Sequence, residues 1–165
     1  MSTKIDIIKA IEDGKIEEVK KYIDEGGDVN ATDKTGQERT LLYLAIAYNN
    51  IKIIKLLLKA GADVNIPDRK SHTLISIAIL WDFPKIAELL LKAGADVDLN
   101  IPNNKGVYPI DRAIKSKNIR MINLLIDNGA KVDLKKLKQT DVEIYKELLI
   151  RSRMGVMYDL LDIYK

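Results

Sequence analysis

A five-residue motif that returns four times is the feature that most constrains how this chain can fold. The copies are Gly26-Gly27-Asp28-Val29-Asn30, Gly61-Ala62-Asp63-Val64-Asn65, Gly94-Ala95-Asp96-Val97-Asp98 and Gly129-Ala130-Lys131-Val132-Asp133. Successive copies begin 35, 33 and 35 residues apart. Self-similarity at a period of this length indicates a stack of repeated structural units in which each unit packs on its neighbours.

Two further patterns keep the same register. Alanines recur with the same three spacings. Ahead of each motif glycine, apolar residues recur three and four positions apart, which is typical of an amphipathic helix. The alanines are Ala10, Ala45, Ala78 and Ala113. The apolar positions are Ile16, Val19, Tyr22 and Ile23; Ile51, Ile54, Leu57 and Leu58; Pro84, Ala87, Leu90 and Leu91; and Ile119, Ile122, Leu125 and Ile126.

The ends of the expected helices also carry signals. Each amphipathic helix should end at the glycine of the motif, because a residue without Cβ readily takes the left-handed conformation that closes a helix. A shorter apolar helix should precede it, and Thr40 and Thr73 stand where its N-cap belongs. Each repeat is therefore predicted to contain a turn and two antiparallel helices.

A unit of about 33 residues with this organisation and a Thr-Pro-Leu-His-x-Ala start is the ankyrin pattern. The sequence resembles the ankyrin-repeat family: Thr40 and Thr73 keep the threonine and Pro109 keeps the proline, although Tyr43, Ser76 and Asp111 replace the histidine. The resemblance covers nearly the whole chain. It implies an all-α repeat solenoid of about five repeats, whose helix-turn-helix units are joined by β-hairpin-like loops.

We expect a single domain over residues 1–165. Residues 1–29 would form an N-terminal cap repeat, 30–64, 65–98 and 99–133 internal repeats, and 134–165 a degenerate C-terminal cap repeat. A shift of 35 residues places Leu148 in the fifth inner helix, where a small alanine is normal, and puts Met154, Met157, Leu160 and Leu161 in the outer helix. Two-residue insertions are expected at Glu38-Arg39 and around Asp98-Leu99.

The residue inventory argues against an enzyme. The chain has no cysteine, which excludes disulfides, thiolate nucleophiles and cysteine-ligated metals. Its one histidine, His72, is expected at a solvated hairpin tip without an acidic or second histidine partner, so a catalytic triad is not indicated. Apart from Gly26-Gly27 the glycines stand singly, and they form no glycine-rich phosphate-binding loop. We expect no catalysis, cofactor or metal site.

The resemblance implies a binding groove lined by hairpin tips and by the exposed ends of the inner helices. Counting from the shared alanine, those ends carry Tyr48, Leu80 and Trp81, with Lys115 at the equivalent place in the fourth repeat. Exposed aromatic residues beside a leucine resemble the anchors of protein interfaces. The alternative is that Trp81 only covers the seam between repeats. Phe83 either extends this patch or, in the preferred interpretation, fills the turn.

Basic residues are expected to surround the apolar centre. They are Lys34, Arg39, Arg69, Lys70 and Lys105 at hairpin tips, followed by Lys135, Lys136 and Lys138 where a fifth hairpin is predicted. Such a rim favours a partner protein with an acidic patch, although surface lysines are commonly just solvated. The alternative function is a nucleic-acid or polyanion binder, which the interleaved acidic residues and the formal charge of only +3 disfavour.

The leading hypothesis is a monomeric, non-catalytic module that binds another protein as an adaptor, an inhibitor or an effector. Charges interrupt the short apolar runs near residue 1, and no stretch approaches the roughly 18 apolar residues of a membrane span. We therefore expect a soluble cytoplasmic protein, or one in a host cytosol if it is an effector. The resemblance also makes Asn30 and Asn65 candidates for hydroxylation, but turn geometry explains both asparagines.

Overall fold

The computed structural model describes residues 6–96, 99–102 and 106–151. In these residues the chain forms ten α-helices and one isolated antiparallel bridge, between Thr32 and Thr40. The helices belong to two compact units that divide between residues 97 and 98. The predicted all-α organisation of helix pairs joined by hairpin-like loops is confirmed, whereas the repeat boundaries and the single domain remain predictions.

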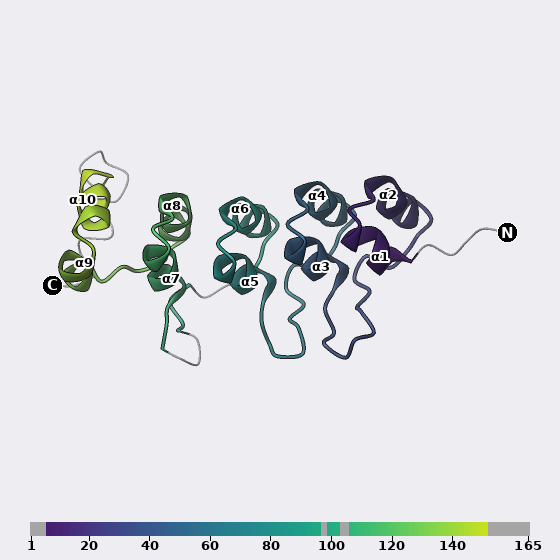
Figure 1. The fold of residues 1–165 in the computed structure, drawn as a ribbon, viewed down its shortest axis with the longest axis horizontal. Helices are drawn as coiled ribbons and strands as arrows, with labels where there is room; N and C mark the ends of the chain where they lie inside the picture. The colour runs from purple at the N-terminus through teal and green to yellow at the C-terminus, as the bar shows by residue number, and fades with distance from the viewer. Residues whose placement is uncertain (1–5, 97–98, 103–105, 152–165) are drawn as a thin grey trace. The chain divides into compact units, whose positions relative to one another are not determined.

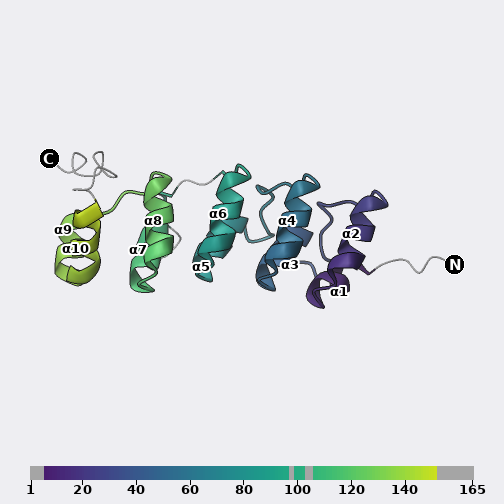
Figure 2. The ribbon, with the colours of Figure 1, turned by 90° about the horizontal axis from the view of Figure 1, so that it is seen from above.

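The first unit consists of three helix pairs. Each pair has a shorter first helix, called inner here, and a longer second helix, called outer, and the two pack against each other. The pairs are α1 (Ile7–Glu12) with α2 (Ile16–Asp24), α3 (Leu41–Ala47) with α4 (Ile51–Lys59), and α5 (Leu74–Leu80) with α6 (Pro84–Lys92). Within this unit the inner helices form one row, the outer helices a second row, and the hairpins extend from the inner row (Figures 1 and 2).

The predicted helix ends are present in the structure. The Thr40 and Thr73 hydroxyl oxygens accept hydrogen bonds from the backbone N–H groups of Tyr43 and Ser76, at 3.1 and 3.3 Å. These bonds satisfy N–H groups that have no partner inside the helix. At the other end of an outer helix, Gly61 follows α4 with φ of 87°. A side chain at that φ is strained, which explains why glycine recurs there.

The repeated alanines and the outer-helix stripes form the core of the first unit. Ala45 and Ala78 have no exposed surface, and the same holds for Leu57 and Leu90 on the outer helices. The small alanine side chain lets the inner helix approach the outer helix closely, while the longer side chains fill the space on either side. The register deduced from sequence is therefore correct in these repeats.

The motif asparagines connect one repeat to the next. Asn30 Oδ1 accepts a hydrogen bond from the backbone N–H of Asp63 at 2.8 Å, and Asn65 Oδ1 accepts one from Asp96 at 2.7 Å. The Asn65 amide also donates to the Gly94 carbonyl at 3.3 Å. The asparagine side chain thus forms hydrogen bonds with backbone groups of the neighbouring repeat, which accounts for asparagine at the end of the motif.

In the second unit the structure places this asparagine two residues later. Asn100, rather than Asp98, accepts from the backbone N–H of Lys131 at 2.8 Å and donates to the Gly129 carbonyl at 3.0 Å. The extra residues expected around Asp98-Leu99 therefore precede the connecting asparagine, and Leu99 is buried.

The second unit also contains helix pairs. Helix α7 (Pro109–Lys115) packs on α8 (Ile119–Asp127), and α9 (Leu134–Thr140) packs on α10 (Val142–Arg151). Figure 1 shows α9 level with α7 and α10 level with α8. Two contacts agree with this placement: Lys136 of α9 lies 3.7 Å from the Asp111 carboxylate of α7, and Arg151 of α10 pairs with Asp127 of α8.

The prediction of a fifth hairpin is wrong, because residues 134–140 form α9 instead. The Asp133 carboxylate accepts from the backbone N–H of Lys136 at 2.9 Å and caps this helix. The segment contains no glycine or proline to break the helix. Leu148 consequently lies on α10 and is buried there, rather than in an inner helix under the alanine positions. Met154, Met157, Leu160 and Leu161 lie outside the described residues.

Candidate protein-binding surface

The three predicted apolar anchors are exposed at the ends of neighbouring inner helices. Tyr48 follows α3 and is 51% exposed, while Leu80 ends α5 and Trp81 follows it, with 45% and 38% of their surfaces exposed. Helix α3 packs against α5. The chain turns sharply after each helix, with φ of 51° at Asn49 and 60° at Asp82. Large apolar side chains are thus held on short turns rather than on long mobile loops.

Trp81 is also packed against other aromatic side chains. Its ring lies 6.3 Å from that of Tyr43 on the preceding inner helix and 6.1 Å from that of Phe83, both edge-to-face. Such pairs are favourable beyond their buried area. Trp81 therefore covers the seam between two repeats and also keeps more than a third of its surface exposed, and its role as a binding anchor stays a prediction. Phe83 precedes α6 and is half-buried.

Two hairpins of the first unit are closed in the same way, by an aspartate paired with a basic residue. In the hairpin before α3, the buried Asp33 carboxylate accepts from Arg39 Nε at 2.6 Å. In the hairpin before α5, the Asp68 carboxylate accepts from the His72 backbone N–H at 2.9 Å and lies 3.0 Å from His72 Nδ1. The expectation that His72 lacks an acidic partner is wrong, because the hairpin brings Asp68 back onto it.

These two pairs were not predicted from the sequence, although both hairpins share the same arrangement of the aspartate and the basic residue. In both hairpins the backbone N–H of the aspartate donates to the carbonyl of the basic residue, Asp33 to Arg39 and Asp68 to His72. The basic residue stands directly before the threonine that caps the inner helix. The two-residue insertion in the first of these hairpins therefore lengthens its tip and leaves the closing pair intact.

The hydrogen bonds lower the pKa of both carboxyl groups. Burial alone would raise the pKa of Asp33 and of Asp68 above the usual value of 3.8, but bonds from Arg39 and Thr35, and from His72 and Lys70, lower it overall. Burial raises the pKa of the nearby Tyr43 phenol, and the Asp68 charge adds to this. The Arg39 guanidinium lies 5.8 Å above the Tyr43 ring. Ionised carboxylates are thus part of the folded hairpins.

These shifts predict that the hairpins lose stability in acid. A carboxyl whose folded pKa is lower than its unfolded pKa stabilises the fold above the unfolded value, and this contribution disappears as the pH falls through the folded value. We expect the double variant Asp33→Asn/Asp68→Asn to be less stable than the parent chain at pH 7 and to lose less stability between pH 5 and pH 3. Urea unfolding across that range measures both. Parallel pH profiles for the two chains would contradict the prediction.

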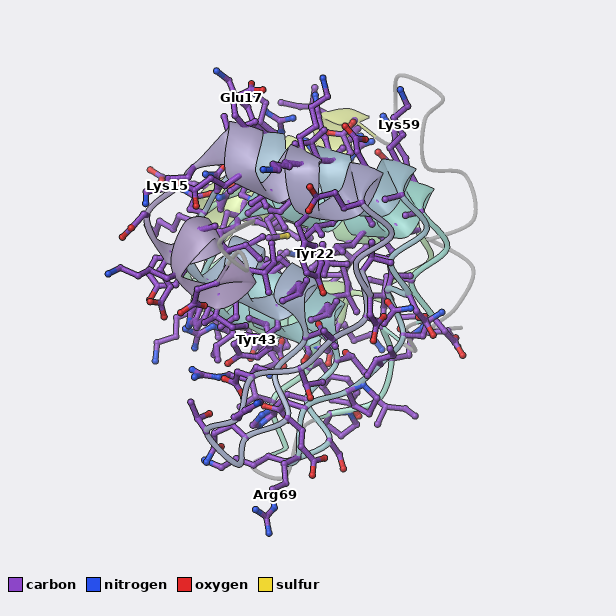
Figure 3. The ribbon with its side chains drawn as sticks, turned by 90° about the vertical axis from the view of Figure 1, so that its right-hand side faces the viewer. Lys15, Glu17, Tyr22, Tyr43, Lys59 and Arg69 are labelled. Carbon is purple, nitrogen blue, oxygen red and sulfur yellow. The ribbon has the colours of Figure 1, made fainter. Side chains whose placement is uncertain are left out.

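The predicted basic residues of the first unit differ in whether their charged groups are already bonded within the protein. Lys34 and Lys70 are exposed, and within the part of the chain that the structure describes neither ammonium group has a carboxylate partner. Arg69 extends from the hairpin tips (Figure 3), but its guanidinium donates to the Gly36 carbonyl of the preceding hairpin at 3.0 Å. Arg39 is two-thirds buried and paired with Asp33. Two lysines therefore provide most of the available positive charge at these tips.

The remaining predicted positions belong to the second unit. Lys115 is exposed at the end of α7. Lys105 lies outside the described residues. Lys135, Lys136 and Lys138 are exposed on α9 rather than on a hairpin. Within residues 6–96, 99–102 and 106–151, no cluster of three or more histidine or acidic side chains could hold a metal ion.

Comparison with known proteins agrees with the repeat organisation. A family model described as ankyrin repeats in three copies matches residues 7–101, more than half of the chain. The chain belongs to the ankyrin-repeat family. Ankyrin repeats generally mediate binding to other proteins and are generally not enzymatic. Within the described residues, every helix is too short or too polar to span a lipid bilayer.

Individual relatives are similar to parts of the chain, and one of them matches a stretch longer than residues 7–101. A putative ankyrin repeat protein of fowlpox virus is 34% identical over 122 residues, which are 73% of this chain and 15% of that protein. A second one from the same virus is 40% identical over 55 residues, 33% of this chain and 38% of its own length. An ankyrin repeat-containing protein of Schizosaccharomyces pombe is 37% identical over 60 residues, 36% of this chain and 28% of that protein. The chain thus spans less than half the length of each of these relatives.

Proposed function

We propose that this chain is a non-catalytic module that binds a partner protein through the surface formed by Tyr48, Leu80 and Trp81. The observation that carries the proposal is the exposure of three large apolar side chains on adjacent inner helices, each more than a third accessible. Exposed apolar residues that cluster on a rigid surface are typical of protein interfaces. The module acts in the cytoplasm, or in a host cytosol, as an adaptor, an inhibitor or an effector, and it is a monomer before it binds.

The charge around this surface favours an acidic partner. Lys34 and Lys70 project from the neighbouring hairpins with unpaired ammonium groups among the described residues, and Arg69 is exposed beside them. Positive charge at the rim of an interface accelerates association with an acidic partner more than it adds affinity. Arg39 contributes mainly by holding its hairpin in shape. Lys105 and Lys115 remain predicted contacts of the fourth repeat.

The test combines binding with stability. A partner recovered by affinity capture is titrated by calorimetry against the parent chain and against the double variant Tyr48→Ala/Trp81→Ala. We expect a loss of about 2 kcal/mol or more in binding, which is about 30-fold in Kd. The matched control is Ile150→Ala, which shortens an apolar side chain that is 59% exposed on α10 and should leave Kd unchanged.

Unfolding of the same variants separates a binding role from a core role. Loss of the Trp81 ring removes two edge-to-face contacts, so we expect about 1–2 kcal/mol of destabilisation. A buried tryptophan would cost about 3–5 kcal/mol. An unchanged Kd in the double variant would overturn the proposed surface. An affinity that falls steeply with salt concentration but does not change when Trp81 is replaced would indicate polyanion binding instead.

A further inference from the structure

The apolar anchors and the basic hairpin tips lie at opposite ends of the inner helices. Tyr48, Leu80 and Trp81 stand at the C-terminal ends of α3 and α5, whereas the hairpins that carry Lys34 and Lys70 join the N-terminal ends. A helix of this length spans about 10 Å, which exceeds the Debye length of about 8 Å at physiological ionic strength. The lysine charges are therefore largely screened at the anchors, and closer groups select the partner side chains that bind there.

The charged group beside the anchors is the carboxylate of Glu12. Glu12 ends α1, is exposed, and belongs to the helix that packs against α3. Partial burial raises the pKa of the Tyr48 phenol, and a hydrogen bond with Glu12 and the negative charge of Glu12 raise it further. Lys15, beyond the turn, pairs with Asp13 and Glu18 at 3.5 and 3.4 Å. In the part of the chain that the structure describes, no basic side chain forms an ion pair with Glu12.

The positive charge that also acts on Tyr48 is already neutralised. It belongs to Arg39, whose guanidinium donates to the buried Asp33 carboxylate at 2.6 Å and lies over the Tyr43 ring. The Glu12 carboxylate, in contrast, offers about four lone-pair sites, of which the Tyr48 phenol uses one. An exposed aromatic ring and a carboxylate with free acceptor sites therefore stand side by side, which suits a cation from the partner.

We propose that the partner places an arginine against Glu12 and the exposed ring of Tyr48. Apolar side chains of the same segment lie on Leu80 and Trp81, about 10 Å further along, since packed helices are about that far apart. Arginine fits better than lysine because its planar guanidinium can donate two hydrogen bonds to one carboxylate while its face stacks on an aromatic ring. This inference rests on the proposed function, because it names the partner chemistry of the same surface.

Peptides selected from a random library on the full chain serve as probes, and calorimetry measures their Kd. Only peptides that fail to bind the double variant Tyr48→Ala/Trp81→Ala are kept, because these occupy the proposed surface. The test variant is Glu12→Lys, and a lysine suits the C-terminal end of α1. The control is Glu17→Lys, which changes the net charge equally but lies on the outer helix α2 (Figure 3). Thermal unfolding checks that both variants stay folded.

We expect the kept peptides to contain arginine, and Glu12→Lys to raise their Kd about five- to tenfold while Glu17→Lys leaves it unchanged. A peptide in which glutamate replaces that arginine should bind the Glu12→Lys variant more tightly than the parent chain. Kept peptides without arginine, or equal effects of the two lysine variants, would overturn this inference and leave the proposed surface intact. If no selected peptide depends on Tyr48 and Trp81, the proposed surface and this inference are both wrong.

Discussion

Leu90→Ala is expected to lower the free energy of unfolding by about 2–5 kcal/mol. Leu90 lies on the inward face of α6 and has no exposed surface. The substitution removes buried methyl groups and leaves a cavity that the rigid helix pair can close only in part. Urea unfolding followed by far-UV circular dichroism measures the loss.

A matched control uses an exposed leucine of the same helix pair. Leu80→Ala deletes the same atoms at the end of α5, where 45% of the side chain is exposed. We expect its effect to stay within about 0.5–1 kcal/mol, because water already reaches much of that surface. Similar losses for the two variants would mean that Leu80 belongs to the core and would remove one of the three proposed anchors.

Ala78→Leu is the second large expected effect, about 1–3 kcal/mol of destabilisation. Ala78 lies on α5 with no exposed surface. Extra methylene groups there force the inner and outer helices apart or push neighbouring side chains off their preferred rotamers. Thermal and urea unfolding should both detect the change.

The same substitution at an exposed alanine provides the control. Ala93 follows α6 and is exposed, so Ala93→Leu should shift stability by no more than about 0.5 kcal/mol. Equal stability of the Ala78→Leu variant and the parent chain would contradict the helix register, and with it the assignment of Tyr48 and Trp81 to exposed helix ends.

Most of the fold of the first unit could be predicted from the sequence because its determinants are local. Gly61 allows the backbone conformation that ends a helix, Thr40 supplies an oxygen that starts one, and Ala45 permits close packing. Each of these effects acts within a few residues and recurs with the repeat. The exposure of Tyr48 and Trp81 followed from the same register, since their positions were counted from the buried alanines.

The fold of the C-terminal part could not be predicted from the repeat period alone. A shift of 35 residues carried the pattern past Asp133, but the aspartate at this motif position caps a helix, whereas Asn30 and Asn65 at the same motif position bond to the next repeat. The segment that follows has leucines at positions 134 and 137 among good helix formers. Local helix signals therefore outweighed the repeat, and α9 formed where a hairpin was expected.

The basic rim was predicted from residue types, which do not reveal partners. Arg39 and His72 looked like solvent-facing groups, yet each is held by an aspartate at the other end of its own hairpin. The pairing depends on how the hairpin folds back, with separations of six and four residues. Lys34 and Lys70 lie near the turns and are not paired in this way, so residue type alone predicted their exposure correctly.

The asparagine bonds between repeats have a consequence for exchanging repeats between proteins. Asn30 and Asn65 accept from backbone N–H groups of the following repeat, at Asp63 and Asp96, and make no use of the aspartate side chains in doing so. Any residue other than proline offers that donor. A foreign repeat placed behind either asparagine could therefore keep this hydrogen bond whatever side chain it carries at the donor position, provided that the residue there is not proline. New binding surfaces could then be assembled on the same backbone, one helix pair at a time.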